Sequence, residues 1–168
     1  MPADLQSLVR AWRTNNTVDI QLVEQIPPRL WAAEIPGLPR RTFRAIAAHL
    51  HNSRRSWIRT LGSEHGVTVP DRVDQFTVSR RALVAALRRS GRGLEEILQL
   101  GIDAGGTVPD SRGYVWRNLP LDVAHVLAYF VAHEAHHRGQ IVMAARQLGQ
   151  RLPRKATNDL WQWTRIAK

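Results

Sequence analysis

Apolar residues recur at intervals of three and four along most of this chain, which is the pattern of amphipathic helices. Residues at these spacings share one face of a helix, so each such stretch offers one apolar side to a core. No stretch reads as a credible strand. We therefore expect an all-α protein, a four-helix bundle with helices at residues 1–26, 41–61, 79–101 and 120–149.

Breaks in this pattern predict where the helices bend and how they connect. Polar residues 15–17 are expected to bend or expose the middle of the first helix, and glycines within 90–93 to kink the third. A short turn of helix is expected after Pro28. The long connection 101–119, between the third and fourth helices, is too polar and Gly-rich to be helical, so we expect a crossover or a short hairpin there.

The C-terminal residues 151–168 form a tail that we expect to pack back on the bundle. Leu160, Trp161 and Trp163 are too apolar to be left in water. No linker or repeat divides the chain, and 168 residues are enough for a sizeable core. The expectation is therefore a single domain over residues 1–168.

The amino-acid composition restricts the possible chemistry more than it restricts the possible fold. The sequence has no cysteine, which excludes disulfides, cysteine-ligated zinc, iron–sulfur clusters and a cysteine nucleophile. A metal ion would have to be held by His, Asp or Glu. Neither a signal-peptide core nor a membrane-length apolar run is present, so a cytoplasmic protein is the expectation.

The formal net charge of +10 raises the question of nucleic acid as a partner. Almost all of the positive charge is arginine, since Lys155 and Lys168 are the only lysines. The arginines are scattered along the chain, and no nucleic-acid-binding motif accompanies them. Specific binding of nucleic acid is therefore not expected.

The stretch His133-Glu134-Ala135-His136-His137 lies in the middle of the fourth predicted helix. Its first and last histidines are four residues apart, so they lie one above the other on the helix face and can grip one metal ion. The alternative is two core histidines satisfied by hydrogen bonds. The same face carries a core-facing stripe, which consists of Val126, Tyr129, Phe130, His133, His137, Gln140, Ile141, Ala144 and Leu148. A metal site on this stripe is the favoured interpretation.

The second predicted helix supplies the candidate for a third ligand. One flank of its apolar stripe carries arginines together with His51, so we expect His51 to face water. The other flank is small and uncharged and contains His49, Ser56 and Thr60, which suits close helix packing or the wall of a pocket. This is the reason to choose His49 as a ligand; the alternative is a surface histidine beside the stripe.

The central stretch also matches H-E-x-x-H, the helix of zinc peptidases in which the glutamate is the general base. The longer form of that motif needs Gly and His where this sequence has Gln140 and Met143. The other form needs a downstream glutamate, and none follows Glu134. A peptidase is therefore not expected. Glu134 projects about 80° away from the two histidines, so we expect it to be dispensable for metal binding.

Three segments together resemble the DinB/YfiT-like superfamily. They are residues 133–141 with their His-Glu-Ala-His-His start, Ala48-His49-Leu50 in the second helix, and the aromatic tail 160–163. The resemblance implies a four-helix bundle that forms homodimers and holds a divalent metal ion, commonly zinc or nickel. Carried over residue by residue, the metal ligands are His49, His133 and His137.

The resemblance also implies a range of activities on small-molecule substrates. Some relatives are thiol-dependent S-transferases that join a low-molecular-weight thiol to an electrophile, while others are hydrolases or isomerases, and a non-catalytic metal-binding stress-response module is a further alternative. Three neutral imidazoles leave a metal ion at least one open position, as catalytic sites do. Gln140 could orient a bound cofactor or a water molecule. Gly139 is expected to let helices approach closely, and His136 lies beside the site or at the surface.

Overall fold

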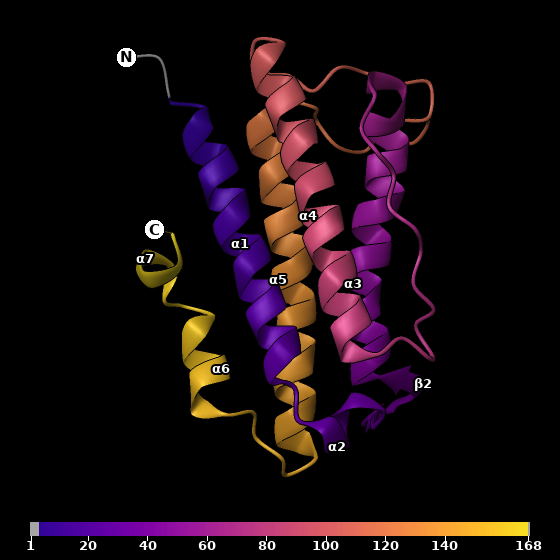
Figure 1. Ribbon diagram of the computed structural model, residues 1–168, viewed down its shortest axis with the longest axis vertical. Helices are drawn as coiled ribbons and strands as arrows, with labels where there is room; N and C mark the ends of the chain where they lie inside the picture. Colours follow the sequence, from indigo (N-terminus) through magenta and orange to yellow (C-terminus); the bar gives the residue numbers. More distant parts are fainter. Residues whose placement is uncertain (1–3, 168) are drawn as a thin grey trace.

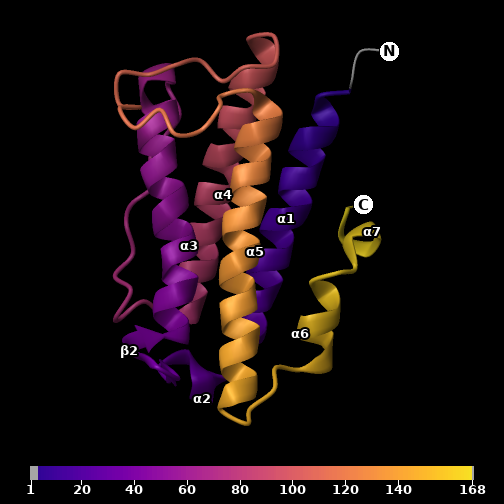
Figure 2. The same ribbon diagram turned by 180° about the vertical axis from the view of Figure 1, so that it is seen from behind.

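Four long helices run along the longest axis of the molecule and form the bundle (Figure 1). The computed structural model describes residues 4–167. Helices α1 (Gln6–Gln25) and α3 (Phe43–Trp57) each pack against both α4 (Arg80–Asp103) and α5 (Val123–Gln147). The view from behind shows α5 between α3 and α1, with α4 on the far side (Figure 2). The expected all-α four-helix bundle is confirmed.

Side-chain hydroxyls and carboxylates fix where these helices begin. Thr42 accepts a hydrogen bond from the backbone N–H of Ala45 and caps α3, and Ser79 accepts one from that of Ala82 and caps α4. The expected start of α5 near Pro120 is wrong. Asp122 caps the helix instead, by accepting a hydrogen bond from the backbone N–H of His125.

A short antiparallel hairpin follows the first helix, in contrast to the expectation of no strands. It pairs β1 (Glu34–Ile35) with β2 (Leu38–Thr42), and Gly37 makes the turn with a φ of 75°, which glycine adopts without strain. The expected turn of helix before it is α2 (Pro28–Trp31). After α3 the chain widens into a π-helical turn, η1 (Ile58–Gly62), and then tightens into a 3₁₀ turn, η2 (Ser63–His65).

Two expected irregularities are absent. Helix α1 is unbroken at Asn15, which is fully buried rather than exposed, although its expected start at Met1 lies outside the described residues. Helix α4 likewise continues through Gly91, where an added Cβ would lie 2.5 Å from the side chain of Asn16. The glycine therefore allows α1 and α4 to approach closely instead of causing a kink.

The C-terminal tail returns to the bundle as two short helices. Both α6 (Arg154–Asp159) and α7 (Trp163–Ile166) pack against α1, as expected (Figure 1). Trp161 departs from the expectation, since its side chain is 83% exposed. No helix among residues 4–167 is long and apolar enough to cross a membrane.

The core is layered along α5. Phe130 belongs to an apolar cluster with Trp12 and Trp57 near one end of the bundle, and Ile141 to a second cluster near the other end. Between these two residues α5 buries polar side chains, which include Glu134. This polar layer across the middle of the bundle holds the candidate site.

Candidate metal centre

Helices α3 and α5 lie side by side (Figure 2). They bring together the three histidines that were predicted as metal ligands. The Nε2 atom of His133 lies 3.3 Å from Nε2 of His49 and 3.2 Å from Nε2 of His137. One ring nitrogen from each of the three lies within 4.8 Å of the other two. The three histidines therefore form one cluster, although His49 is far from the other two in sequence.

The spacing of these nitrogens suits a divalent ion. Tetrahedral zinc with Zn–N bonds of about 2.0–2.1 Å holds neighbouring nitrogen ligands about 3.3 Å apart. Both measured separations from His133 are close to that value. All three donors are imidazole nitrogens, a set that zinc and nickel accept readily. The residues present therefore fit the metal ion that the family resemblance implies.

The environment of the cluster favours neutral imidazoles, the form that binds metals. His137 is 9% exposed and the other two rings are half-buried. Burial, followed by the charges of the neighbouring histidines, lowers the pKa of His49 to about 4 and that of His133 to about 4. Burial also lowers the pKa of His137. All three rings are thus ready to coordinate at neutral pH.

Gln140 orients one of the ligands. Its Oε1 atom accepts a hydrogen bond from Nδ1 of His137 at 2.8 Å, and its Nε2 donates to Nε2 of His136 at 3.0 Å. A proton on Nδ1 leaves the lone pair of His137 Nε2 free to point into the cluster, as in metal sites where a second residue fixes the tautomer. Both polar atoms of the Gln140 side chain are thereby bonded to histidines. Its expected contact with a cofactor remains a prediction.

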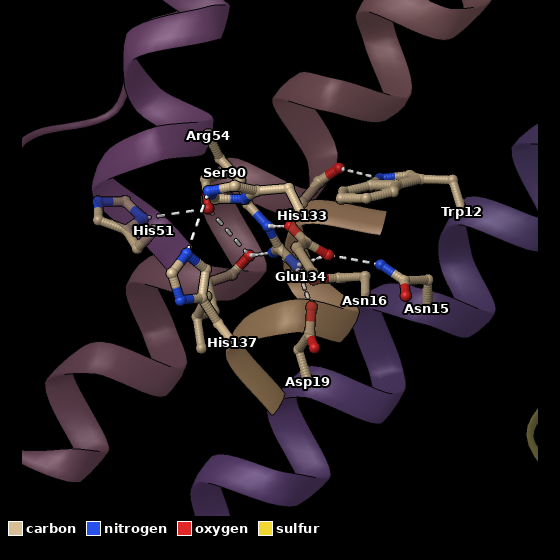
Figure 3. Close-up of polar contacts among 12 residues, drawn as sticks. Trp12, Asn15, Asn16, Asp19, His51, Arg54, Ser90, His133, Glu134 and His137 are labelled. Atoms are coloured by element: carbon tan, nitrogen blue, oxygen red, sulfur yellow. Dashed lines mark hydrogen bonds and ion pairs between the residues drawn. The ribbon is translucent and has the colours of Figure 1, made fainter. Parts of the chain in front are cut away.

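A buried ion network lies directly behind the histidines (Figure 3). The guanidinium of Arg54 donates to Glu134 at 2.6 Å and to Asp19 at 2.7 Å. Asn15 donates to the second carboxylate oxygen of Glu134, and Arg138 donates to Asp19 at 2.6 Å. Two arginines and two carboxyl groups therefore form one buried network in the centre of the bundle.

The network shifts the pKa values of its carboxyl groups in opposite directions. Burial and the nearby charge of Glu134 raise the pKa of Asp19 well above its ordinary value. Burial alone would also raise the pKa of Glu134, but the charge of Arg54 and its hydrogen bonds keep it below the ordinary value. Glu134 is therefore the carboxylate that Arg54 holds ionised.

Glu134 does not face the histidines as a peptidase base would. Its carboxylate is completely buried and points toward Arg54 and Asn15 (Figure 3). The geometry leaves Glu134 outside the three-histidine cluster and makes it part of the structural core, and its dispensability for metal binding remains a prediction. The sequence contained a signal for this network, since Asp19 follows Trp12 by two helical turns on the apolar stripe of α1.

The prediction that His51 faces water is wrong, because its side chain is completely buried. Its Nδ1 lies 3.1 Å from the hydroxyl of Ser90 (Figure 3). Its Nε2 lies 2.8 Å from the backbone oxygen of Asp71. Both partners come from other segments of the chain, so the periodicity of one helix held no sign of them. His51 therefore links α3 to α4 and to the loop that precedes α4.

The other candidate residues near the site take no part in the histidine cluster. His125 pairs with Asp122 at the exposed start of α5, outside the cluster, and His136 is exposed. Gly139 does not serve close helix packing, because an added Cβ would meet no atom within 4 Å. That expectation was wrong.

A pocket of about 300 Å³ lies beside the C-terminal part of α3, beyond the histidine cluster. Ser56 and Thr60, from the uncharged flank of α3, form part of its wall, as the sequence analysis allowed. Trp57 also lines it, and its ring lies 5.3 Å from that of Tyr129, which in turn stacks on His133 at 6.3 Å. Aromatic side chains thus lead from the histidines to a hollow of ligand size.

The fold and the cluster define a helical-bundle protein whose three histidines are placed to hold a metal ion. The chain matches the DinB family over residues 1–164, so it belongs to the DinB family. Comparison with curated proteins finds no match.

Proposed function

We propose that the chain binds one divalent metal ion, zinc or nickel, at His49, His133 and His137 and that it is a metal-dependent enzyme. The three converging Nε2 atoms support this proposal more directly than any other observation. Within residues 4–167 no carboxylate takes part in the cluster, so a bound ion would keep its full positive charge. A histidine-only set of three is typical of catalytic sites, which keep a position open.

The reaction that we propose is the transfer of a low-molecular-weight thiol to a small electrophile. A divalent ion with an open position deprotonates a bound thiol and makes it nucleophilic at neutral pH. The chain has no cysteine, so the thiol must come from a cosubstrate. A new S–C bond forms, the thiol proton passes to solvent, and the group displaced from the electrophile leaves with its electron pair.

The pocket along α3 is the proposed place for the substrates. Trp57, Tyr114 and Trp116 offer aromatic walls to an apolar electrophile. Arg59 lines the same pocket and offers a cation to an acidic cosubstrate. This hollow is small enough to favour low-molecular-weight substrates.

Thiol consumption against 1-chloro-2,4-dinitrobenzene tests the proposal. The zinc- or nickel-loaded protein should consume glutathione or another small thiol faster than His137→Ala does. His125→Ala is the matched control, because this histidine is exposed and lies outside the cluster. Ester hydrolysis without thiol consumption would instead identify a hydrolase. Full metal occupancy without turnover of either kind would identify a non-catalytic metal-binding protein.

A further inference from the structure

Two adjoining hollows lie on the side of α5 that is turned away from the histidine cluster. The larger, of about 780 Å³, lies between α5 and the C-terminal tail. At about 100° per residue, its lining positions on α5 lie mostly on the face opposite His137. Its walls are largely apolar and include Val131, Val142, Met143, Leu160, Trp161 and Trp163. This volume is within the range of pockets that bind small molecules.

The smaller hollow, of about 270 Å³, adjoins the first and is strongly basic. Val142, Arg146 and Thr157 line both hollows. The smaller one adds Arg151 and Arg154, which brings three exposed arginines to one place. None of the residues that line the two hollows is acidic, and no carboxylate within residues 4–167 forms an ion pair with these arginines.

Arg138 adds a buried cation to the wall of the larger hollow. Its side chain is over nine-tenths buried, and its Nη1 donates to Asn15 at 2.9 Å and to Asp19 at 2.6 Å. No oxygen in the described part of the chain accepts a hydrogen bond from its Nε or Nη2. These two nitrogens are not fully shielded from solvent, so they can donate to water or to an anionic ligand in the hollow.

The mouth of the larger hollow exposes apolar surface. Trp161 is 83% exposed and Met143 is 56% exposed. Large apolar side chains gathered at a concave site typically mark a place where a ligand or partner binds. A matching ligand therefore has an apolar body and an anionic group.

We propose that these hollows bind an organic phosphate with an apolar alkyl or aryl body. The phosphate lies at Arg146, Arg151 and Arg154, whose planar guanidinium groups match phosphate oxygens in pairs. The apolar body lies between α5 and the tail. This site is separate from the metal centre and does not depend on the proposed transferase activity.

Calorimetric titration of the full chain with octyl phosphate tests this site. We expect one octyl phosphate per chain, and at least ten-fold weaker binding of octanol and of inorganic phosphate. Equal binding of inorganic phosphate would show ordinary surface ion binding and would overturn the proposal. Binding to phosphatidate vesicles without binding of monomeric octyl phosphate would overturn it in favour of a membrane surface.

Two variants locate the site. Gly139→Leu should fill the larger hollow without a clash, because an added Cβ at this position meets no atom within 4 Å, and should weaken octyl phosphate at least ten-fold. The pair Arg151→Gln and Arg154→Gln should weaken it similarly. Arg81→Gln with Arg92→Gln removes the same charge from exposed positions on α4 and should change nothing. Unchanged affinity in both site variants, with metal content equal to that of the unaltered protein, would refute the assignment.

Discussion

Replacing Arg54 by methionine should break the ion network at the centre of the bundle. Arg54 is 1% exposed, and its guanidinium bonds to Glu134, Asp19, the side chain of Asn16 and the backbone oxygen of Leu87. It also lies 4.9 Å from the ring of Trp12. Methionine keeps an unbranched apolar stem but lacks the charge and the hydrogen-bond donors, so it leaves two buried carboxyl groups with the single guanidinium of Arg138.

The expected loss follows from this imbalance. Removal of one partner from a buried ion pair costs about 3–5 kcal/mol, because the other charge is left without compensation. In a chain of this size such a loss lowers the melting temperature by about 6–20 °C. Arg88 forms an ion pair with Glu24 in which the side chains are 57% and 46% exposed, so Arg88→Met should cost less than about 1 kcal/mol.

Urea unfolding followed by circular dichroism measures both variants in the metal-free protein. A double variant sharpens the test, since Arg54→Met together with Glu134→Gln leaves Asp19 and Arg138 as a balanced pair. The double variant should be more stable than Arg54→Met alone. An Arg54→Met variant that loses no more stability than Arg88→Met, or a double variant less stable than the single one, would refute the charge-balance reasoning.

Three further predictions concern the metal centre and assembly. Gln140→Ala should lower metal affinity about 10–100-fold in chelator competition, because His137 loses the partner that orients it; Gln147→Ala, an exposed position on α5, should not. The free energy of unfolding of the metal-free protein should fall as the pH drops from about 6.5 toward 4, since His49 and His133 remain neutral in the folded chain but are protonated in the unfolded one. A flat profile in urea titrations over that range would contradict this. The protein should be a homodimer by light scattering at micromolar concentration, as the family resemblance indicates; a monomer mass would contradict it.

The bundle could be predicted because its signal is local. Apolar residues at helical spacing mark each long helix, and Ser79 caps α4 where the sequence indicated. His49 could be selected because the flank of α3 around it carries small, uncharged side chains. The hairpin β1–β2 was missed because it is short and contains prolines, a composition that also fits a loop.

The polar layer could not be predicted in the same way. Asn15 interrupts an apolar stripe, and the sequence alone does not distinguish an exposed interruption from a buried hydrogen-bonded one. Its burial depends on Glu134, which is 119 residues away in the chain. His51 depends similarly on Ser90 and on the backbone of Asp71. Such partners become visible only when the helices are packed together.

The metal content of purified, untagged His49→Ala tests the central claim most directly, with Glu134→Gln measured beside it. Elemental analysis of the unaltered protein should find about one divalent ion per chain, as a single three-histidine site implies. His49→Ala should lose the ion or bind it much more weakly, because only the two ligands from α5 remain. Glu134→Gln should keep its metal, provided that the variant is folded. Full occupancy in His49→Ala, together with an inactive Glu134→Gln that retains its metal, would contradict the assignment and restore the peptidase interpretation of the central motif.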